Sequence, residues 1–298
     1  MRIHNFIYLK RYEAMRILVA LWLAGGVACT PSQSELEFDG QQALLYVEYQ
    51  LSLGPRHPGT SGHEAVADWI GETLEQAGWE RQEQTFWYRG VRLRNIIGRA
   101  GPSDADLIIL GAHYDTRLAA DRDGENPQAP VPGANDGASG VALLLELART
   151  IRPEELSCRV ELVFFDAEDS GGLDGWDWIV GSSHYASLMD TAPVAVVVVD
   201  MIGDRDLQIH QERNSSPALT AEIWSLASDL GHQAFIPEMG RSILDDHMPF
   251  VRRGFEAIDI IDFDYAYWHT VQDTLDKVSA QSLMQVGDTL HTWLAMCR

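Results

Sequence analysis

Residues 159–170 have the sequence RVELVFFDAEDS, a short apolar run that leads directly into three acids, Asp166, Glu168 and Asp169. An apolar run of this length between charged residues is typical of a buried strand in an α/β sheet. Ligands of open α/β sheets bind beyond the carboxyl ends of the strands. Carboxylates buried at such a place are costly unless a positive group lies among them. Taken alone, the stretch fits a salt bridge to a basic loop as well as it fits a ligand site.

Strand patterns and helix patterns alternate along the rest of the chain. Apolar runs predict strands at 94–99, 106–112, 160–165, 194–199 and 257–263, and helical spacing of apolar residues predicts helices at 41–53, 61–77, 141–150, 182–189, 217–230 and 279–296. This alternation indicates an α/β fold, and no break in composition follows residue 40, so we expect a single domain over 41–298. The loop at 119–140, rich in Gly, Pro and Asn, is long enough to predict a functional role.

Composition and charge narrow the possible functions. The 298 residues can bury a sizeable core, and 46% hydrophobic with 22% charged residues is ordinary for a globular protein. The 44 Asp and Glu residues outnumber the 22 Lys and Arg residues, which gives a formal charge of −22. This balance argues against nucleic-acid binding, which needs basic patches. It fits a soluble protein in a salty or extracellular setting.

Residues 1–28 have the pattern of a signal peptide, because basic residues precede a short apolar stretch at 17–28. That stretch is too short to span a bilayer. Cys29 follows Gly-Val-Ala, which resembles a bacterial lipoprotein processing site. We therefore expect export to the periplasm or cell surface with a membrane lipid anchor at Cys29; cleavage nearby with an inert Cys29 is the alternative. The polar residues 29–40 predict a tether.

Two further cysteines, Cys158 and Cys297, lie in the predicted domain. Neither belongs to a CxxC pattern, so neither is predicted to bind a metal. Export permits a disulfide between them, but the sequence leaves their pairing open. We expect the chain to act as a monomer.

Candidate metal ligands gather at the predicted strand ends. They are His113, Asp115, Glu168, Asp169, Asp200 and His269, with Asp136 in the loop that enters a helix. Imidazole with carboxylate and no thiolate predicts a first-row metal, and Zn²⁺ with an open position is the usual catalytic case. Each residue alone has an ordinary alternative: a core histidine, a capped surface histidine or, for Asp136 in Asn-Asp-Gly, a turn. Their joint position at successive strand ends favours a site.

Six motifs carry a family resemblance. They are GAHYDT at 111–116, PGANDGASGVALLLELAR at 132–149, FFDAED at 164–169, VVVDMIG at 197–203, DDHMPFVRRG at 245–254 and WHTVQDT at 268–274. The same motifs occur in this order in zinc aminopeptidases of the co-catalytic type, and the chain resembles their relatives, the glutaminyl cyclases (glutaminyl-peptide cyclotransferases), still more. The resemblance covers essentially all residues after 40. It implies a single domain with a mixed, twisted central β-sheet flanked by helices, as in the zinc aminopeptidase and phosphorylase-hydrolase-like proteins.

The resemblance also implies a zinc site. Asp136, Asp169 and His269 are similar to the ligands of the single zinc in cyclases, with Asp169 where the family often has Glu. His113, together with Asp200, would bind a second metal in the aminopeptidases. We expect one Zn²⁺ in a cyclase and two in an aminopeptidase, and the residues for both arrangements are present.

Catalytic and substrate-binding residues follow from the resemblance as well. Glu168 resembles the catalytic acid and base, and Asp200 and Asp245 resemble the carboxylates beside it and beside the substrate amine. Trp268 resembles the aromatic wall of the substrate pocket. We assign Trp176 of a Trp-rich insert to the same wall; for the second tryptophan of that insert, packing over the sheet edge is at least as good an explanation.

Two activities are implied, and both act on peptides or proteins with a free N-terminus. A cyclotransferase would convert N-terminal glutamine to pyroglutamate with release of ammonia, using one zinc and Glu168 as a proton shuttle. A dizinc aminopeptidase would hydrolyse N-terminal residues with the same side chains. Trp268 beside His269, where many aminopeptidases have Tyr, and the pair Asp245 and Asp246 favour the cyclase. A non-catalytic scaffold would have lost Glu168 or a ligand, and none is missing.

Overall fold

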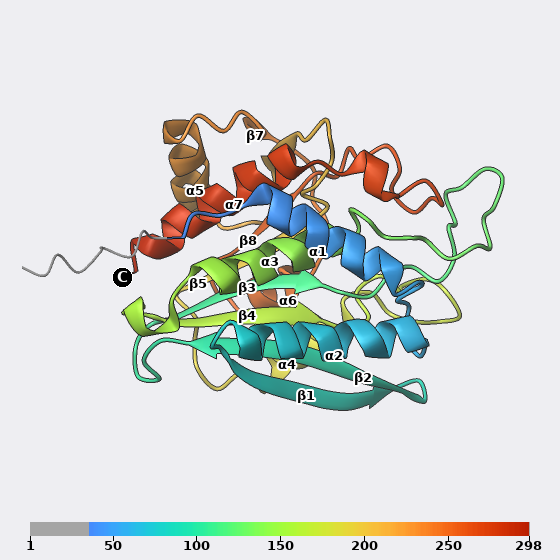
Figure 1. Ribbon diagram of the computed structural model, residues 1–298, viewed down its shortest axis with the longest axis horizontal. Helices are drawn as coiled ribbons and strands as arrows, with labels where there is room; N and C mark the ends of the chain where they lie inside the picture. The colour runs from blue at the N-terminus through green and yellow to red at the C-terminus, as the bar shows by residue number, and fades with distance from the viewer. Residues whose placement is uncertain (1–35, 298) are drawn as a thin grey trace, which may run out of the picture. The chain divides into compact units, whose positions relative to one another are not determined.

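A computed structural model describes residues 36–297, and a six-stranded mixed sheet forms its centre (Figure 1). The strand order is β1–β2–β4–β3–β5–β8. The bounds are Glu80–Tyr88 (β1), Val91–Ala100 (β2), Leu107–His113 (β3), Arg159–Phe165 (β4), Ala195–Asp200 (β5) and Ala257–Ile261 (β8). Strands β3, β4, β5 and β8 are parallel, whereas β2 is antiparallel to both of its neighbours. The expected single-domain α/β fold with a mixed central sheet is confirmed.

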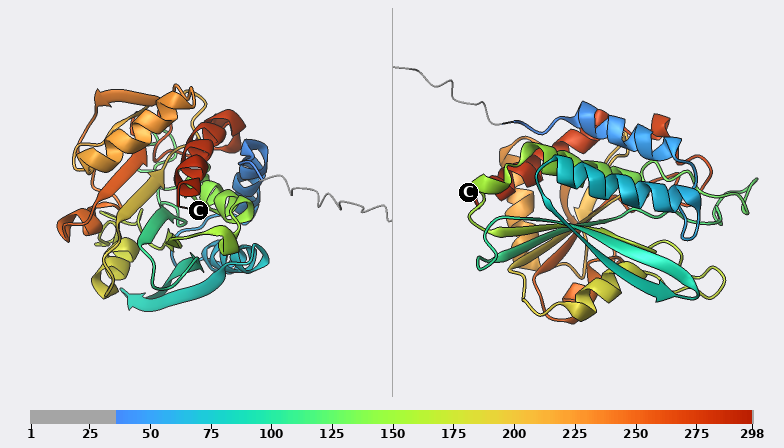
Figure 2. Two further views of the ribbon diagram at one scale, coloured as in Figure 1. Left: turned by 90° about the vertical axis from the view of Figure 1, so that its left-hand side faces the viewer. Right: turned by 60° about the horizontal axis from the view of Figure 1, so that its bottom comes forward.

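Helices cover both faces of the sheet (Figure 1, Figure 2). One side carries α1, α2, α3, α5 and α7, and the opposite side carries α4 and α6. The bounds are Gly40–Ser52 (α1), Ser61–Gln76 (α2), Ala138–Thr150 (α3), Val180–Leu188 (α4), Pro217–Asp229 (α5), Met248–Arg252 (α6) and Ala280–Ala295 (α7). The described residues also form two 3-10 helices, Pro153–Glu155 (η1) and Leu275–Lys277 (η2), and a small parallel sheet of Ile209–Gln211 (β6) and Phe235–Met239 (β7).

Strand β4 is buried on both of its faces, as its apolar run predicts. Successive side chains of a strand point to opposite faces. Val160, Leu162 and Phe164 accordingly pack with α1, α2, α3 and α7. Val163 and Phe165 pack against α4 and α6 on the other side. All of these side chains are fully buried. Because buried apolar area stabilises the fold by roughly 25 cal/mol per Å², their burial holds β4 in the interior.

The carboxyl ends of β3, β4 and β5 meet at one edge of the sheet because these strands are parallel neighbours. His113 is the last residue of β3 and Asp200 is the last residue of β5. Asp166 follows β4 directly. The strand ends that carry the predicted ligands therefore lie side by side.

Strand β1, with the sequence ERQEQTFWY, is absent from the sequence prediction. Its side chains are exposed or half-buried because it is an edge strand of the sheet, so it has no apolar run to detect. Pairing along its whole length with β2, from Glu80 opposite Arg99 onwards, holds it in place. The strand predicted at 257–263 ends earlier, at Ile261.

The predicted signal peptide, Cys29 and the first part of the tether lie outside the described residues. At the start of the described chain, the Asp39 carboxylate accepts a hydrogen bond from the Gln41 backbone N–H at 2.8 Å and caps α1. The Asp39 N–H donates to Glu146 Oε1 of α3 at 2.9 Å, which attaches this segment to the domain. Between residues 36 and 297 every helix is too short or too polar to cross a bilayer.

Cys158 and Cys297, whose pairing the sequence leaves open, form a disulfide between the residue before β4 and the second residue after α7. The two cysteines are 139 positions apart, so the bond closes a long loop of the unfolded chain. We expect the double variant Cys158→Ala/Cys297→Ala to unfold with a free energy lower by about 2–5 kcal/mol, measured by urea denaturation. Turnover per folded molecule should stay the same, because the bond lies at the end of β4 opposite the strand-end acids. A variant of unchanged stability would contradict this prediction.

Candidate active site

A cavity of about 230 Å³ lies at the carboxyl edge of the sheet. Its lining includes Asp136, Glu168, Asp169, Asp200, Asp245, Trp268 and His269. These are the predicted site residues except His113, Asp115 and Trp176. Side chains from five separate segments therefore converge on one small cavity, as their positions at the strand ends predict.

Asp136, Asp169 and His269 form a first group with the spacing of metal ligands. His269 Nε2 lies 3.1 Å from Asp169 Oδ1 and 3.9 Å from Asp136 Oδ2. The three side chains are buried, with exposed fractions of 1–3%. They come from the loop before α3, the loop after β4 and the loop after β8, so the fold joins residues that are far apart in the sequence.

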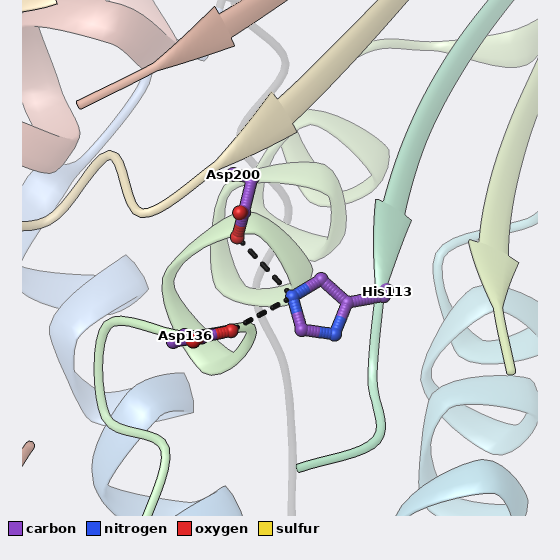
Figure 3. A group of neighbouring side chains, drawn as sticks. All are labelled: His113, Asp136 and Asp200. Atoms are coloured by element: carbon purple, nitrogen blue, oxygen red, sulfur yellow. Dashed lines mark hydrogen bonds and ion pairs between the residues drawn. The ribbon is translucent and has the colours of Figure 1, made fainter. Parts of the chain in front are cut away.

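His113, Asp136 and Asp200 form a second group (Figure 3). His113 Nε2 lies 3.1 Å from Asp136 Oδ1 and 3.2 Å from Asp200 Oδ1. Asp136 points toward both histidines and belongs to both groups. The geometry therefore suits two metals, held by the residues of both groups, as well as one metal held by the first group alone.

The first group fits a divalent cation. Asp169 Oδ2 is buried and finds no hydrogen-bond partner among the described residues. Burial raises the pKa of Asp169 to about 6, and the neighbouring Asp136 carboxylate adds to the rise. A cation among these groups would supply the positive charge that buried carboxylates need. Oxygen and nitrogen donors without sulfur suit Zn²⁺, which Asp136, Asp169 and His269 would hold.

Arg117 links two members of the first group. Its Nη1 donates to Asp169 Oδ1 at 3.3 Å, and its Nε and Nη2 donate to the two Asp121 oxygens at 2.8 Å. Asp121 Oδ1 lies 3.2 Å from His269 Nδ1, the ring nitrogen that faces away from Asp169. A carboxylate on the second nitrogen of a ligating histidine fixes the orientation of the ring. Neither Arg117 nor Asp121 is predicted from the sequence, although Arg117 directly follows the GAHYDT motif.

We expect Arg117→Ala to lower the affinity for zinc by about 10–100-fold, because the variant releases Asp121 and removes a donor from Asp169. Competition with a chromophoric chelator measures this affinity. The control is Arg152→Ala, which removes an ion pair with Glu155 on the surface and should bind zinc as the parent protein does. Equal zinc affinity in the two variants would show that Arg117 does not support the ligands.

Two further acids hold the backbone beside the ligands. Asp115 accepts hydrogen bonds from the N–H groups of Glu168 at 2.9 Å and Asp169 at 3.2 Å. Asp273 accepts one from the N–H of Asp136 at 3.1 Å. Burial raises the pKa of Asp273 to about 7, with a further rise caused by Asp136. Asp115 thus supports the site without lining the cavity, and Asp273, in the WHTVQDT motif, is a supporting residue that sequence analysis missed.

Besides Asp169, three acids of the cavity have raised pKa values. Burial raises the pKa of Glu168 well above its usual range, and the neighbouring Asp245 carboxylate contributes. Burial raises the pKa of Asp200 to about 7, although its hydrogen bond with His113 opposes the rise. The pKa of Asp245 is raised by burial too, against the effect of His247. Carboxyls raised toward neutrality are suited to give and to accept protons in catalysis.

Tryptophan side chains wall the cavity. Trp268 lines it as expected, and Trp178 lines it with its ring nearly parallel to that of His269, at 9° and 6.1 Å between centroids. The prediction for Trp176 is wrong, because its ring packs against Tyr88 at 5.3 Å, outside this cavity. The Trp-rich insert does contribute to the wall, but through Trp178. For this residue the sequence supports packing over the sheet edge at least as well.

Known proteins resemble this chain in sequence and in structure. The sequence profile of Peptidase family M28 matches residues 95–294. Aminopeptidase YwaD of Bacillus subtilis (strain 168) is 24% identical over 91% of this chain. The match spans 60% of YwaD, which is less than two thirds of that protein.

Two solved structures share the fold at higher identity. The crystal structure of Porphyromonas gingivalis glutaminyl cyclase is 32% identical, with a TM-score of 0.82 over 87% of this chain and 98% of that chain. A Zn-dependent exopeptidase from Parabacteroides distasonis ATCC 8503 is 30% identical, with a TM-score of 0.81 over 88% of this chain and 99% of that chain. Both named activities therefore occur among the relatives.

Proposed function

The chain belongs to peptidase family M28, and on that premise we propose that it is a glutaminyl-peptide cyclotransferase, which converts N-terminal glutamine of peptides or proteins to pyroglutamate and releases ammonia. One observation carries the proposal. Three buried acids with raised pKa values, Glu168, Asp200 and Asp245, line the same tryptophan-walled cavity as the ligand group. Cyclisation needs this kind of proton transfer, from an attacking amine to a departing nitrogen.

The proposed reaction joins two groups of one substrate residue. The α-amine attacks the γ-carbonyl carbon of the glutaminyl side chain, so the cavity has only to hold that residue in a reactive geometry. Glu168 accepts the proton that the amine loses and transfers it to the amide nitrogen. The new C–N bond closes the lactam ring, and the old C–N bond breaks to release ammonia.

The other residues of the cavity support this step. Asp200 and Asp245 would bind the amine, and the Asp245 charge adds to the rise that burial causes in the pKa of Glu168. Asp136, Asp169 and His269 would hold one Zn²⁺, which when bound supplies a Lewis acid for the γ-carbonyl group. The tryptophan walls would exclude the water that hydrolysis requires.

A dizinc aminopeptidase is the second candidate, and the complete group of His113, Asp136 and Asp200 favours it (Figure 3). His113, Asp136, Asp169, Asp200 and His269 would then hold two cations. Glu168 would act as the general base toward water, and the first peptide bond of the substrate would be hydrolysed. The two candidates use the same side chains and differ in whether water reacts.

Mass spectrometry of a Gln-initiated and an Ala-initiated peptide, each incubated with the purified protein, separates the two candidates. We expect loss of ammonia from the Gln peptide above the rate without protein, an intact Ala peptide and about one zinc per chain by elemental analysis. Release of free amino acids from both peptides, with about two zincs per chain, would replace the cyclotransferase by the aminopeptidase.

A further inference from the structure

A second cavity, of about 290 Å³, adjoins the active-site cavity and takes no part in the proposed reaction. Ile243 and Phe263 line both cavities. Along this segment of the chain, Met239, Gly240 and Arg241 line the second cavity, whereas Ser242 and Leu244, on the two sides of Ile243, line the first. The two cavities therefore lie end to end along the same segments, with Ile243 and Phe263 as their common wall.

Apolar and polar side chains both line the second cavity, the apolar ones being Met239, Ile243, Ile261 and Phe263. The buried Glu212 carboxylate in its wall is satisfied by hydrogen bonds from the Ser215 hydroxyl and the Ile243 N–H. Ile243 and Ile261 are buried, and Met239 is 55% exposed although it is apolar. At the rim, Arg241 Nη2 donates to Asp264 Oδ1 at 2.8 Å, so the two charges neutralise each other. Exposed apolar surface rimmed by polar groups is typical of a binding site, and methionine adapts to side chains of different shape. These properties suit an uncharged, apolar ligand group.

We infer that the second cavity binds the apolar side chain of the residue that follows the N-terminal residue of a peptide substrate. The inference rests on the proposed function, which puts the N-terminal residue in the first cavity. The substrate chain has to leave that cavity, and an extended residue spans roughly 3.3–3.6 Å. The next side chain then reaches the wall formed by Ile243 and Phe263 and turns into the second cavity.

This arrangement makes the second cavity a determinant of specificity. Peptides with leucine in second position bury apolar area there, whereas aspartate would lose hydration without a free positive partner, because Arg241 is already paired with Asp264. Glutamine amide, which has no second residue, does not reach this cavity. The cavity therefore affects the KM of peptides and leaves the chemistry of the first residue unchanged.

The test compares kcat/KM for Gln-Leu-Gly amide, Gln-Asp-Gly amide and glutamine amide. We expect the parent protein to prefer the Leu peptide over the Asp peptide by about five- to tenfold, from the burial of one side chain. Met239→Glu should remove this preference by raising the KM of the Leu peptide, and Met239→Ser should change it in the same direction. Turnover of glutamine amide should be unchanged in both, because Met239 lines only the second cavity. The control is Leu188→Glu, at a leucine of α4 that is 60% exposed outside both cavities.

Each outcome has a distinct meaning. Absence of ammonia release from glutamine amide and from both peptides would overturn the proposed function and this inference with it. Turnover of glutamine amide combined with equal kcat/KM for the two peptides would overturn the inference alone. A preference for leucine that persists in Met239→Glu would also overturn it, because the selectivity would then arise elsewhere.

Discussion

Glu168→Gln lowers the turnover of a Gln-initiated peptide by about 10²–10⁴-fold, and the zinc content of the variant equals that of the parent protein. The amide has nearly the shape of the carboxyl group but cannot accept and return a proton. Glu168 belongs to neither ligand group, so its replacement leaves the metal-binding side chains intact. Its backbone N–H remains bonded to Asp115, which keeps the strand end in place. Steady-state kinetics and elemental analysis of one preparation measure both quantities.

The same substitution on the surface provides the control for Glu168→Gln. Glu125→Gln changes an exposed glutamate in the loop between β3 and α3 and should leave turnover unchanged. Loss of zinc from Glu168→Gln would mean that this residue is a ligand, and its assignment as the proton shuttle would then be wrong. Retention of both zinc and turnover would remove Glu168 from the mechanism.

The interior strands could be predicted from the sequence because burial on both faces leaves a local mark. The β4 run ends in acids, and the neighbouring strands end in His113 and Asp200, so parallel pairing alone brings these side chains together. The edge strand β1 leaves no such mark, since its position depends on pairing with β2 rather than on apolar side chains. Local sequence patterns therefore predict the carboxyl ends of the interior strands, which carry the ligands, better than they predict the edge strand β1.

Residues that only orient the ligands could not be predicted from their amino-acid type. Arg117 and Asp121 matter because loops place them against Asp169 and His269, and a charged pair four residues apart has many ordinary explanations. The choice between the two tryptophans of the insert failed for a similar reason. They are two positions apart in a loop without regular periodicity, so only the folded backbone decides which ring faces the cavity.

Asp136→Asn removes zinc from the protein and lowers turnover by about 10³-fold, because Lewis-acid stabilisation is worth several kcal/mol and each ~1.4 kcal/mol is a factor of ten. Asp136 is the shared member of both ligand groups, so its loss affects every cation that the site could hold. The substitution is nearly isosteric, and the Asp136 N–H stays bonded to Asp273. Elemental analysis and thermal unfolding of the variant separate metal loss from misfolding. A variant with full zinc content would show that Asp136 is not a ligand.

His113→Ala, compared with Asp136→Asn, reports how many cations the reaction uses. In a one-zinc cyclotransferase His113 is not a ligand of the reacting ion, so the alanine variant should keep about one zinc and lose less than about tenfold in turnover. In a two-zinc aminopeptidase the same change removes one ion, and the loss should approach that of Asp136→Asn. His184→Ala is the control, because the His184 ring stacks on Phe86, which does not line the active-site cavity. Asp136 contacts both His113 and His269, so Asp136→Asn affects the site with one cation or with two. The comparison of the two variants therefore shows whether His113 holds a second cation that the reaction needs.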